Sequence, residues 1–505
     1  MSGNGKLIHG GWLVRDWASS DGTGLTEDGA LYEEGGRIRA IGRYRMLRED
    51  YPEAQSVGGP SYVVVPGFVN AHSHGRGLTT FQMGQPDEPL ETRIAEMAFR
   101  PEWGARDRRS GSEAKRGYDP YLDTLYACLK QIRSGITTTV HSHIYLDGPV
   151  APYADLSRKV AMAYRDSGIR CGFALGIRDC HAITFMDDQE FLSLLRAELK
   201  TSSDLREFRY EMGFPEYYEL LQALSEEFPE VRFQLSPWNP VWCSDRLMEE
   251  LSEASSRHGW RIHTHLMETR YQAEYAHRTY GKSWVARLQD IGMLSERFSG
   301  AHCVWADRDD MEIMKETGAQ VVYNPSSNMR LGSGVAPLRE FLDVGVPVGF
   351  GLDSLGMNDD EDVFQDLRLG QQIQSRPGLA VRPIPAGVMF DMATRAGAAV
   401  SGFDGIGSIA EGNWADVVLL SLPEVEGGVA NQPLPDVLLR RAKAAHVKTV
   451  MIGGNILIED GRWVGWDPDA VLKELSATVR TGKRQTSPTI QVAKDLIRKH
   501  LKSYE

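Results

Sequence analysis

Short apolar runs alternate with amphipathic segments of helical period over residues 66–400. This alternation is typical of βα units arranged around a parallel sheet. The runs with the length and composition of buried strands are residues 63–69, 136–141, 170–176, 232–236, 261–266, 300–304, 319–323 and 347–352. Eight such strands are what a (β/α)8 barrel needs, so the pattern predicts an α/β fold of this type.

One helix of this barrel can be placed directly from its spacing. Its apolar residues share one helical face: Leu122, Leu125, Tyr126, Leu129 and Ile132. Gly135 can end the helix in the left-handed conformation. The β-branched residues that follow predict that the strand at 136–141 begins at once.

Both ends of the chain show short strands separated by glycine turns instead. The N-terminal ones, expected to form a small antiparallel sheet, are residues 6–14, 30–32, 37–41 and 62–65. Residues 415–420 and 447–458 return to this pattern, and we expect them to complete the same sheet. The predicted domains are a discontinuous small domain, 1–66 and 401–475, and a barrel, 67–400.

Two other segments stand apart from these domains. Residues 75–120 form a long insertion rich in Arg, Glu, Gly and Pro, which in a barrel would be the loop after strand one and could act as a lid. Residues 476–505 are charged and contain a predicted helix at 492–501. This tail reads as a disordered segment with a docking helix, or as a subunit contact.

Composition narrows the class of protein. A chain of 505 residues with 42% hydrophobic content can bury a large core. Its net charge of −13, without long single-sign runs, argues against nucleic acid or an anionic membrane as partner and favours a small-molecule substrate. Five cysteines without C-x-x-C spacing favour reduced thiols. With no apolar signal core at the N-terminus and no membrane-length apolar stretch, we expect a cytoplasmic protein.

The candidate chemistry lies where predicted strands end. His72 and His74 follow the first strand, and because side chains two apart on a strand point the same way, they could bind one metal. His265 follows the fifth strand and could be a third nitrogen ligand, with Glu268 placed to take a proton from metal-activated water. Read singly, a His-x-His pair is more often structural, and Glu268 could simply stabilise a helix N-terminus.

Two more strands end in suitable groups. His302, after the sixth strand, could polarise a C=O or C=N bond of the substrate, and Asp353, after the eighth, could be the oxygen ligand and orient the attacking hydroxide. Each could merely close its strand. Together they favour a metal site, because accidents rarely put ligand-type residues at the ends of four barrel strands.

Other residues are weaker candidates for substrate contacts. His141 and His143 end strand two and could touch substrate or bind a second metal. The aromatic residues that could stack on a planar ring, or else lie in the core, are Phe81, Trp238, Trp242, Trp305 and Tyr323. The arginines that could bind a carboxylate, or else face solvent, are Arg76, Arg178 and Arg330.

From Ile38 to Val418 the chain resembles the amidohydrolase superfamily, in its branch of triazine hydrolases, cytosine deaminase-like and guanine deaminase-like enzymes. The segments that carry the resemblance are Pro66-Gly-Phe-Val-Asn-Ala-His-Ser-His74, residues 324–334, residues 345–353 and residues 407–418. The resemblance implies a distorted (β/α)8 TIM barrel, a composite β-sandwich built from both chain ends, and a mononuclear zinc or iron site.

Position by position, the resemblance makes His72, His74, His265 and Asp353 the metal ligands and Glu268 and His302 the proton shuttle and polarising group. Binuclear relatives carry a lysine at the end of strand four, which residues 232–238 lack, so one metal is expected, with zinc first and iron or manganese as alternatives. His263 then reads as core or as support for the ligands. Tyr323 stands where relatives often have histidine.

The resulting functional prediction is a metal-dependent hydrolase of a carbon–nitrogen bond, most simply a deaminase of a nitrogen heterocycle. The alternatives are hydrolysis of an acyclic urea, carbamate or anilide, dechlorination, or a non-catalytic scaffold of the same fold. For substrate contacts we expect His143, Arg178, Trp238, Trp305 and Tyr323. A homodimer or higher homo-oligomer is expected from the resemblance.

Overall fold

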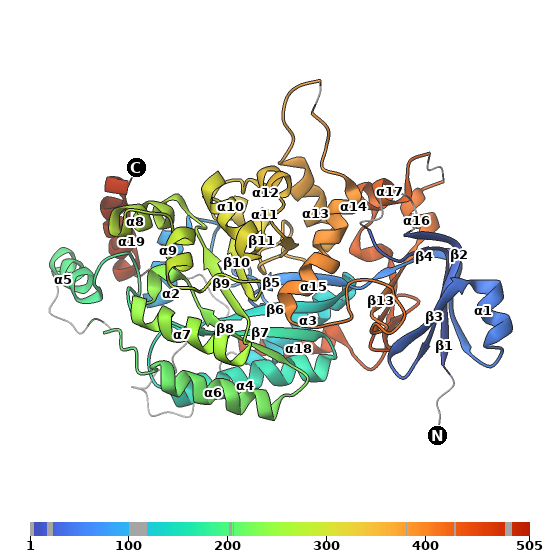
Figure 1. The fold of residues 1–505 in the computed structure, drawn as a ribbon. Helices are drawn as coiled ribbons and strands as arrows, with labels where there is room; N and C mark the ends of the chain where they lie inside the picture. Colours follow the sequence, from blue (N-terminus) through green and yellow to red (C-terminus); the bar gives the residue numbers. More distant parts are fainter. Residues whose placement is uncertain are drawn as a thin grey trace.

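The computed structural model describes residues 5–17, 24–99, 119–200, 205, 207–379, 381–428, 431–479 and 487–504. Two eight-stranded sheets organise these residues. One is parallel and surrounded by helices, and the other lies at the opposite end of the molecule from the C-terminal helix α19 (Figure 1).

The parallel sheet is a nearly closed barrel. Its strands, each paired in parallel with the next, are β5 (Phe68–Ser73), β6 (Ile136–His143), β7 (Arg170–Ile177), β8 (Arg232–Pro237), β9 (Ile262–Leu266), β10 (Phe298–His302), β11 (Gln320–Tyr323) and β12 (Val348–Phe350). No strand ladder joins β12 to β5 among the described residues, but the Asp353 N–H donates to the His72 carbonyl at 2.8 Å across that seam. The eight parallel strands confirm the predicted barrel. Its distortion lies at the seam between β12 and β5, where the strand ladder is missing among the described residues.

Helices alternate with these strands as the apolar periodicity predicts. Those between β5 and the last barrel helix are α2 (Leu90–Phe99), α3 (Pro120–Arg133), α4 (Val150–Ser167), α5 (Asp188–Leu199), α6 (Phe214–Glu227), α7 (Asp245–His258), α8 (Arg270–Tyr280), α9 (Trp284–Asp290), α10 (Arg308–Thr317), α11 (Pro325–Arg330), α12 (Leu338–Val344), α13 (Val363–Gln372), α14 (Ala386–Met392) and α15 (Arg395–Ser401). The predicted face of α3 is confirmed, since Leu125 and Ile132 are fully buried and Gly135 has φ 87°.

The predicted first strand, residues 63–69, was wrong in its boundaries. The structure splits it between β4 (Gln55–Pro66) of the small sheet and β5 of the barrel. Gly67 separates them, with its N–H donating to the Asp416 carbonyl at 2.9 Å. A Cβ at this position would lie 2.2 Å from Thr137 Oγ1, so only glycine lets the chain pass between the two sheets.

The second sheet combines strands from both ends of the chain, in the order β16-β15-β14-β13-β4-β1-β2-β3. Its other strands are β1 (Lys6–Val14), β2 (Leu25–Glu34), β3 (Arg37–Arg43), β13 (Val417–Ser421), β14 (Val447–Ile452), β15 (Asn455–Glu459) and β16 (Arg462–Trp463). β13 pairs antiparallel with β4, so C-terminal strands extend the N-terminal ones. The expected all-antiparallel pairing was wrong, because β1 and β4 run parallel. The exact domain boundaries stay predictions.

The remaining helices flank this sheet or follow it: α1 (Tyr44–Asp50), α16 (Leu422–Glu426), α17 (Leu434–Arg441), α18 (Pro468–Thr478) and α19 (Pro488–Leu501). The helix predicted at 492–501 is therefore longer, and it docks on the barrel beside α2 and α5 (Figure 1). At this contact Lys494 Nζ lies 2.6 Å from both Glu88 Oε1 and Glu96 Oε1. Lys494 is only 6% exposed, so α19 is fastened by a buried cation.

Replacing Lys494 with methionine should destabilise this contact by about 3–5 kcal/mol, because two carboxylates would lose their shared cation in a buried setting. Urea unfolding and limited proteolysis of the C-terminal helix would measure the loss. Lys499→Met, on the exposed side of α19, is the matched control and should change stability little. Equal stability of the two variants would contradict a structural role for Lys494.

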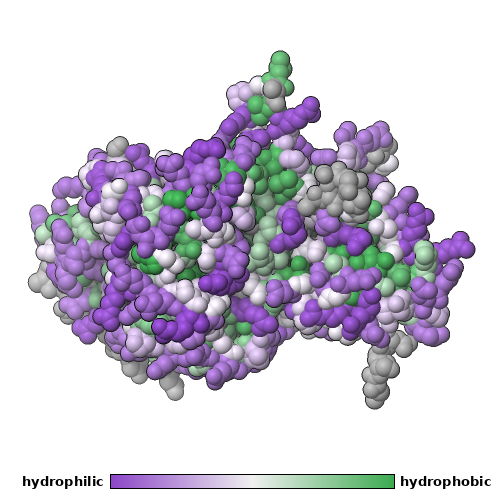
Figure 2. Space-filling view, viewed as in Figure 1, coloured by the Kyte–Doolittle hydropathy of each residue, from purple (hydrophilic) through white to green (hydrophobic). Residues whose placement is uncertain are grey.

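The surface is mostly hydrophilic on the face shown in Figure 2, with apolar side chains at the tip of the loop that protrudes between α13 and α14. Leu379 and Val381 of this loop are exposed. Among the helices of the described ranges, none is long and apolar enough to span a bilayer.

Candidate metal and substrate site

A cavity opens at the carboxyl ends of the barrel strands. Five of the six residues singled out from the sequence line it: His74, His265, Glu268, His302 and Asp353. The sixth, His72, is fully buried beside them. Nitrogen or oxygen atoms of His72, His265, His302 and Asp353 all lie within 4.8 Å of one another. In the described parts of the chain, no other group of histidine, cysteine and carboxylate side chains is arranged in this way.

His74 joins this cluster from the end of β5. Its Nε2 lies 3.1 Å from Asp353 Oδ1 and 3.4 Å from His265 Nε2. His72 Nε2 is also 3.1 Å from Asp353 Oδ1. One carboxylate oxygen therefore faces two imidazole nitrogens that come from the same strand.

Hydrogen bonds fix the tautomers of these rings. The Nδ1–H of His74 donates to the Ser142 carbonyl at 2.9 Å, and that of His265 donates to the Trp238 carbonyl at 2.7 Å. A carbonyl can only accept, so Nδ1 carries the proton in both rings and Nε2 holds a free lone pair. Burial lowers the pKa of His265 well below its usual value, so this ring is neutral near pH 7.

A three-residue relay fixes the His72 ring in the same sense. The Ser299 hydroxyl donates to the Ile262 carbonyl at 3.3 Å, so its oxygen accepts from His263 Nδ1–H at 2.8 Å. His263 Nε2 then accepts from His72 Nδ1–H at 2.7 Å. This leaves His72 Nε2 as a bare acceptor, and burial lowers the pKa of His72 to about 3. His263 thus supports a candidate ligand.

The cluster consequently contains acceptor atoms that face acceptor atoms. His72 Nε2, His302 Nε2 and Asp353 Oδ1 are buried and have no hydrogen-bond partner. Neutral imidazoles cannot donate from Nε2 to the carboxylate, so the arrangement is unfavourable unless a cation lies among them. Imidazole and carboxylate are ligands that suit zinc.

Backbone strain accompanies the site. His302, Asp353 and Met267, which adjoins Glu268, have φ values of 74°, 57° and 43°. Left-handed backbone is costly for residues other than glycine and persists where surrounding structure holds it in place. Here it turns the chain directly after β9, β10 and β12, so that side chains at the strand ends reach the cavity.

Glu268 and His302 lie together at the cavity. Glu268 Oε2 is 3.7 Å from His302 Nε2, and both residues are at least 98% buried. Burial raises the pKa of Glu268 well above its usual value, with Asp353 and Glu91 adding to the shift and Arg93 opposing it. His302 Nδ1 donates to Asn328 Oδ1 at 2.9 Å, which leaves Nε2 toward Glu268. Asn328 lies in the family-like segment 324–334, but sequence reasoning gave it no role.

Helix α2, within the predicted lid segment, forms one wall of the cavity. Leu90, Arg93, Ile94 and Met97 line it at helical spacing. On other faces of α2, Glu91 accepts from the Thr269 hydroxyl and Glu96 binds Lys494. The sequence reasoning missed Arg93, although the i, i+3, i+4, i+7 spacing of these four residues could have revealed the helix. The rest of the lid segment, residues 100–118, lies outside the described residues.

Two of the predicted aromatic residues also line the cavity, Trp238 and Trp242. Their rings lie 4.8 Å apart. Arg178 packs behind them, with its guanidinium 5.4 Å from the Trp238 ring and its Nε–H donating to the Leu146 carbonyl at 2.7 Å. Arg76, another predicted arginine, lines the cavity as well.

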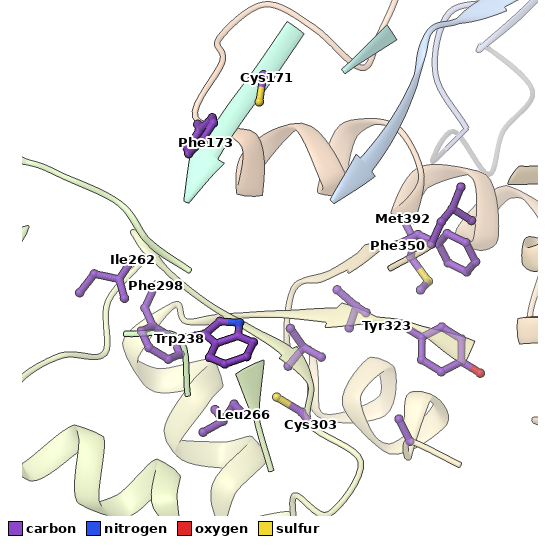
Figure 3. Packing of buried hydrophobic residues seen from close by; sticks show 14 of the residues in the cluster. Cys171, Phe173, Trp238, Ile262, Leu266, Phe298, Cys303, Tyr323, Phe350 and Met392 are labelled. Carbon is purple, nitrogen blue, oxygen red and sulfur yellow. The ribbon is translucent and has the colours of Figure 1, made fainter. Parts of the chain in front are cut away.

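Several sequence candidates lie elsewhere. His141 Nε2 pairs with His143 Nδ1 at 3.1 Å beside Tyr164, outside the cavity lining. The Tyr323 hydroxyl donates to the Gly370 carbonyl, and its ring lies near Phe350 and Met392, apart from Trp238 (Figure 3). The Trp305 indole N–H donates to the Ser333 carbonyl, and Phe81 is 65% exposed. Arg330 forms ion pairs with Asp87 and Asp359. Among these residues the structure gives none a place in the cavity wall.

Comparison with known proteins extends these observations. The family model described as "Amidohydrolase family" matches residues 63–457. A 5'-deoxyadenosine deaminase of Methanothermobacter thermautotrophicus is 30% identical over 405 residues, which is 80% of this chain and 84% of that protein.

Solved structures share the fold. A triazine hydrolase from Arthrobacter aurescens has a TM-score of 0.78 at 22% identity, covering 95% of this chain and 100% of its own. An adenosine deaminase from Xanthomonas campestris with bound zinc has a TM-score of 0.74 at 22% identity, covering 98% of this chain and 99% of its own. The site geometry above therefore lies in a fold that carries zinc in at least one similar protein.

Proposed function

The chain belongs to the amidohydrolase family, and we propose that it is a metal-dependent aminohydrolase that removes an amino group from a nitrogen heterocycle. Hydrolysis of a carbon–nitrogen bond is the activity class of its deaminase relatives. The observation that carries the proposal is the set of unprotonated Nε2 atoms facing Asp353 beside a buried glutamate.

One divalent cation, with zinc as the first candidate, fits the donor set. His72, His74 and His265 would offer Nε2 lone pairs, and Asp353 would offer Oδ1. When bound, the cation lowers the pKa of a water molecule toward neutrality and so supplies a nucleophile near pH 7. Iron and manganese bind the same ligand types and stay alternatives.

The surrounding residues supply proton transfer and charge stabilisation. Glu268 accepts a proton from the attacking water and passes it to the departing nitrogen, for which its raised pKa suits it. Asp353 orients the water. His302 stabilises negative charge on the ring through Nε2, because its Nδ1–H is committed to Asn328. Burial lowers the pKa of His302, so Nε2 takes up its proton only as negative charge develops beside it.

The cavity wall favours a flat, largely apolar ligand. The side chains that line it include Trp238, Trp242, Leu90, Ile94 and Met97, and apolar and aromatic walls of this kind are typical of small-molecule sites. Aromatic side chains can stack on a planar ring. The names of relatives that act on deoxyadenosine, methylthioadenosine and S-adenosylhomocysteine support an aminopurine-type ring.

The proposal is tested by measuring ammonia release from aminopurines, aminopyrimidines, aminotriazines, ureas and amides. We expect release from at least one aminated heterocycle, loss of activity after chelation, and recovery with zinc, iron or manganese. Purified protein should contain about one metal per chain. Activity confined to ureas or amides, or turnover that persists without metal, would contradict the proposal.

A further inference from the structure

Taking the proposed function as its basis, we infer that the heterocyclic substrate carries a carboxylate, which Arg93 binds on the α2 wall of the cavity. Arg93 belongs to the row of α2 residues that faces the cavity. Arg93 is only 8% exposed, and its Nη1 has no hydrogen-bond partner.

A buried guanidinium with an open nitrogen requires compensation. Burial lowers the pKa of Arg93, although arginine stays charged at neutral pH. An unpaired buried charge is strongly unfavourable, so such groups are normally paired. Arg93 therefore has free hydrogen-bonding capacity at the place where a ligand would lie.

The charges of Asp353 and Asp87 act on Arg93, and that of Arg93 acts on Glu268, but among the described residues no ion pair joins Arg93 to any of them. Several carboxylates nearby are engaged by other groups. Asp87 and Asp359 both pair with Arg330. On α2 itself, Glu91 accepts from the Thr269 hydroxyl, and Glu96 binds Lys494 and the Gln85 amide. Within the described residues, these contacts leave Arg93 as a cation of the cavity wall that is open to a ligand anion.

Further donors line the same cavity. The indole nitrogens of Trp238 and Trp242 are buried and lack hydrogen-bond partners. An indole N–H can only donate, and a guanidinium presents a planar fork that matches a carboxylate. Arg76 also lines the cavity, so among the described residues the wall carries two cations, of which Arg93 has the open nitrogen. A single open guanidinium fork with neutral donors fits a singly charged carboxylate better than a phosphate, which carries about −1.5 to −2 charges at pH 7.

The experiment compares three matched ligands for each aminated ring: one with a carboxylate, one with the neutral carboxamide and one with a phosphate. The rings are adenosine, substituted at the 5' carbon, an aminopyrimidine and an aminotriazine. Metal-loaded wild type should prefer a carboxylate over its carboxamide by about tenfold or more in kcat/KM. In Arg93→Met, kcat/KM for the carboxylate should fall by about 10- to 100-fold, mainly through KM, and that for the carboxamide by less than about twofold.

Controls separate binding from folding and from effects on Glu268. Arg93→Lys keeps the positive charge but lacks the planar guanidinium. Its kcat/KM for the carboxylate ligand should lie between those of wild type and Arg93→Met. Arg246→Met, at a side chain that is 87% exposed, should behave as wild type. Melting temperature and metal content report folding, and both should be retained in Arg93→Met because it removes an unpaired charge from a partly apolar wall.

Three results would overturn the inference: equal preference for carboxylate and carboxamide, a preference for phosphate, or an equal loss for charged and neutral ligands in a folded Arg93→Met. The last would mean that Arg93 acts only through the charge state of Glu268. Calorimetric binding of the same ligands separates this inference from the proposed function. Carboxylate binding that depends on Arg93 without ammonia release would reject the aminohydrolase and retain the anion site.

Discussion

Replacing Glu268 with glutamine should slow turnover by about 10²- to 10⁴-fold, the usual contribution of general acid–base catalysis. Glutamine has nearly the same shape, so the change removes proton transfer and little else. Glu268 lies at the cavity, 3.7 Å from His302 Nε2, with its backbone N–H donating to Gln272 Oε1 at 2.9 Å. That contact involves only the backbone of residue 268, so it survives the substitution.

The measurement is kcat of the metal-loaded variant together with its metal content. Glu361→Gln is a matched control, because Glu361 is also buried and burial raises its pKa to about 7, yet it lies outside the cavity lining. We expect the control to keep near wild-type turnover. A Glu268→Gln protein with full metal and undiminished kcat would remove Glu268 from the mechanism.

Replacing Asp353 with asparagine should weaken metal binding by about 100-fold or more, since loss of a group that only supports a ligand typically costs 10- to 100-fold. Asp353 Oδ1 faces the Nε2 atoms of both His72 and His74 at 3.1 Å. Asparagine removes the negative charge but tolerates the φ of 57° at this position, so the backbone should keep its course.

Bound metal per chain, measured after dialysis against a chelator of known affinity, tests this expectation. Asp366→Asn is the control, because Asp366 is another buried carboxylate, with a pKa raised by burial to about 7, that does not line the cavity. Unchanged metal affinity in Asp353→Asn would exclude Asp353 as a ligand.

The same titration separates His74 from His302, since atoms of both rings approach the cluster. We expect His74→Ala to lose metal as Asp353→Asn does, and His302→Ala to keep metal but lose turnover. The reverse result would make His302 the third nitrogen ligand and reassign the polarising role.

Local pattern was sufficient for much of the barrel. Buried parallel strands read as continuous apolar runs, and a polar residue at the end of such a run, like His302 or Asp353, is visible in the chain itself. The face of α3 and its stop at Gly135 follow from spacing and backbone preference. The boundary at Gly67 was not readable, because the run 63–69 is apolar throughout and its break depends on contact with Thr137.

The parallel pairing of β1 with β4 also lay beyond the sequence, since strand direction depends on how distant segments meet. The same holds for the aromatic and arginine candidates. Trp238 follows β8 and lines the cavity, whereas Tyr323 is the last residue of β11 and packs against Phe350. A shift of one residue relative to the strand end changes the direction of the side chain, and the sequence does not show where each strand ends.

The amino-acid sequence by itself determined the barrel, the order of its strands and the candidate ligands at their ends, because apolar periodicity and ligand chemistry are local properties. Only the tertiary structure decided which nitrogen of each imidazole is free, that α19 fastens α2 through Lys494, and that Arg93 is a buried cation with an open nitrogen. These features depend on partners far apart in the chain, and spacing along the sequence carries no record of them.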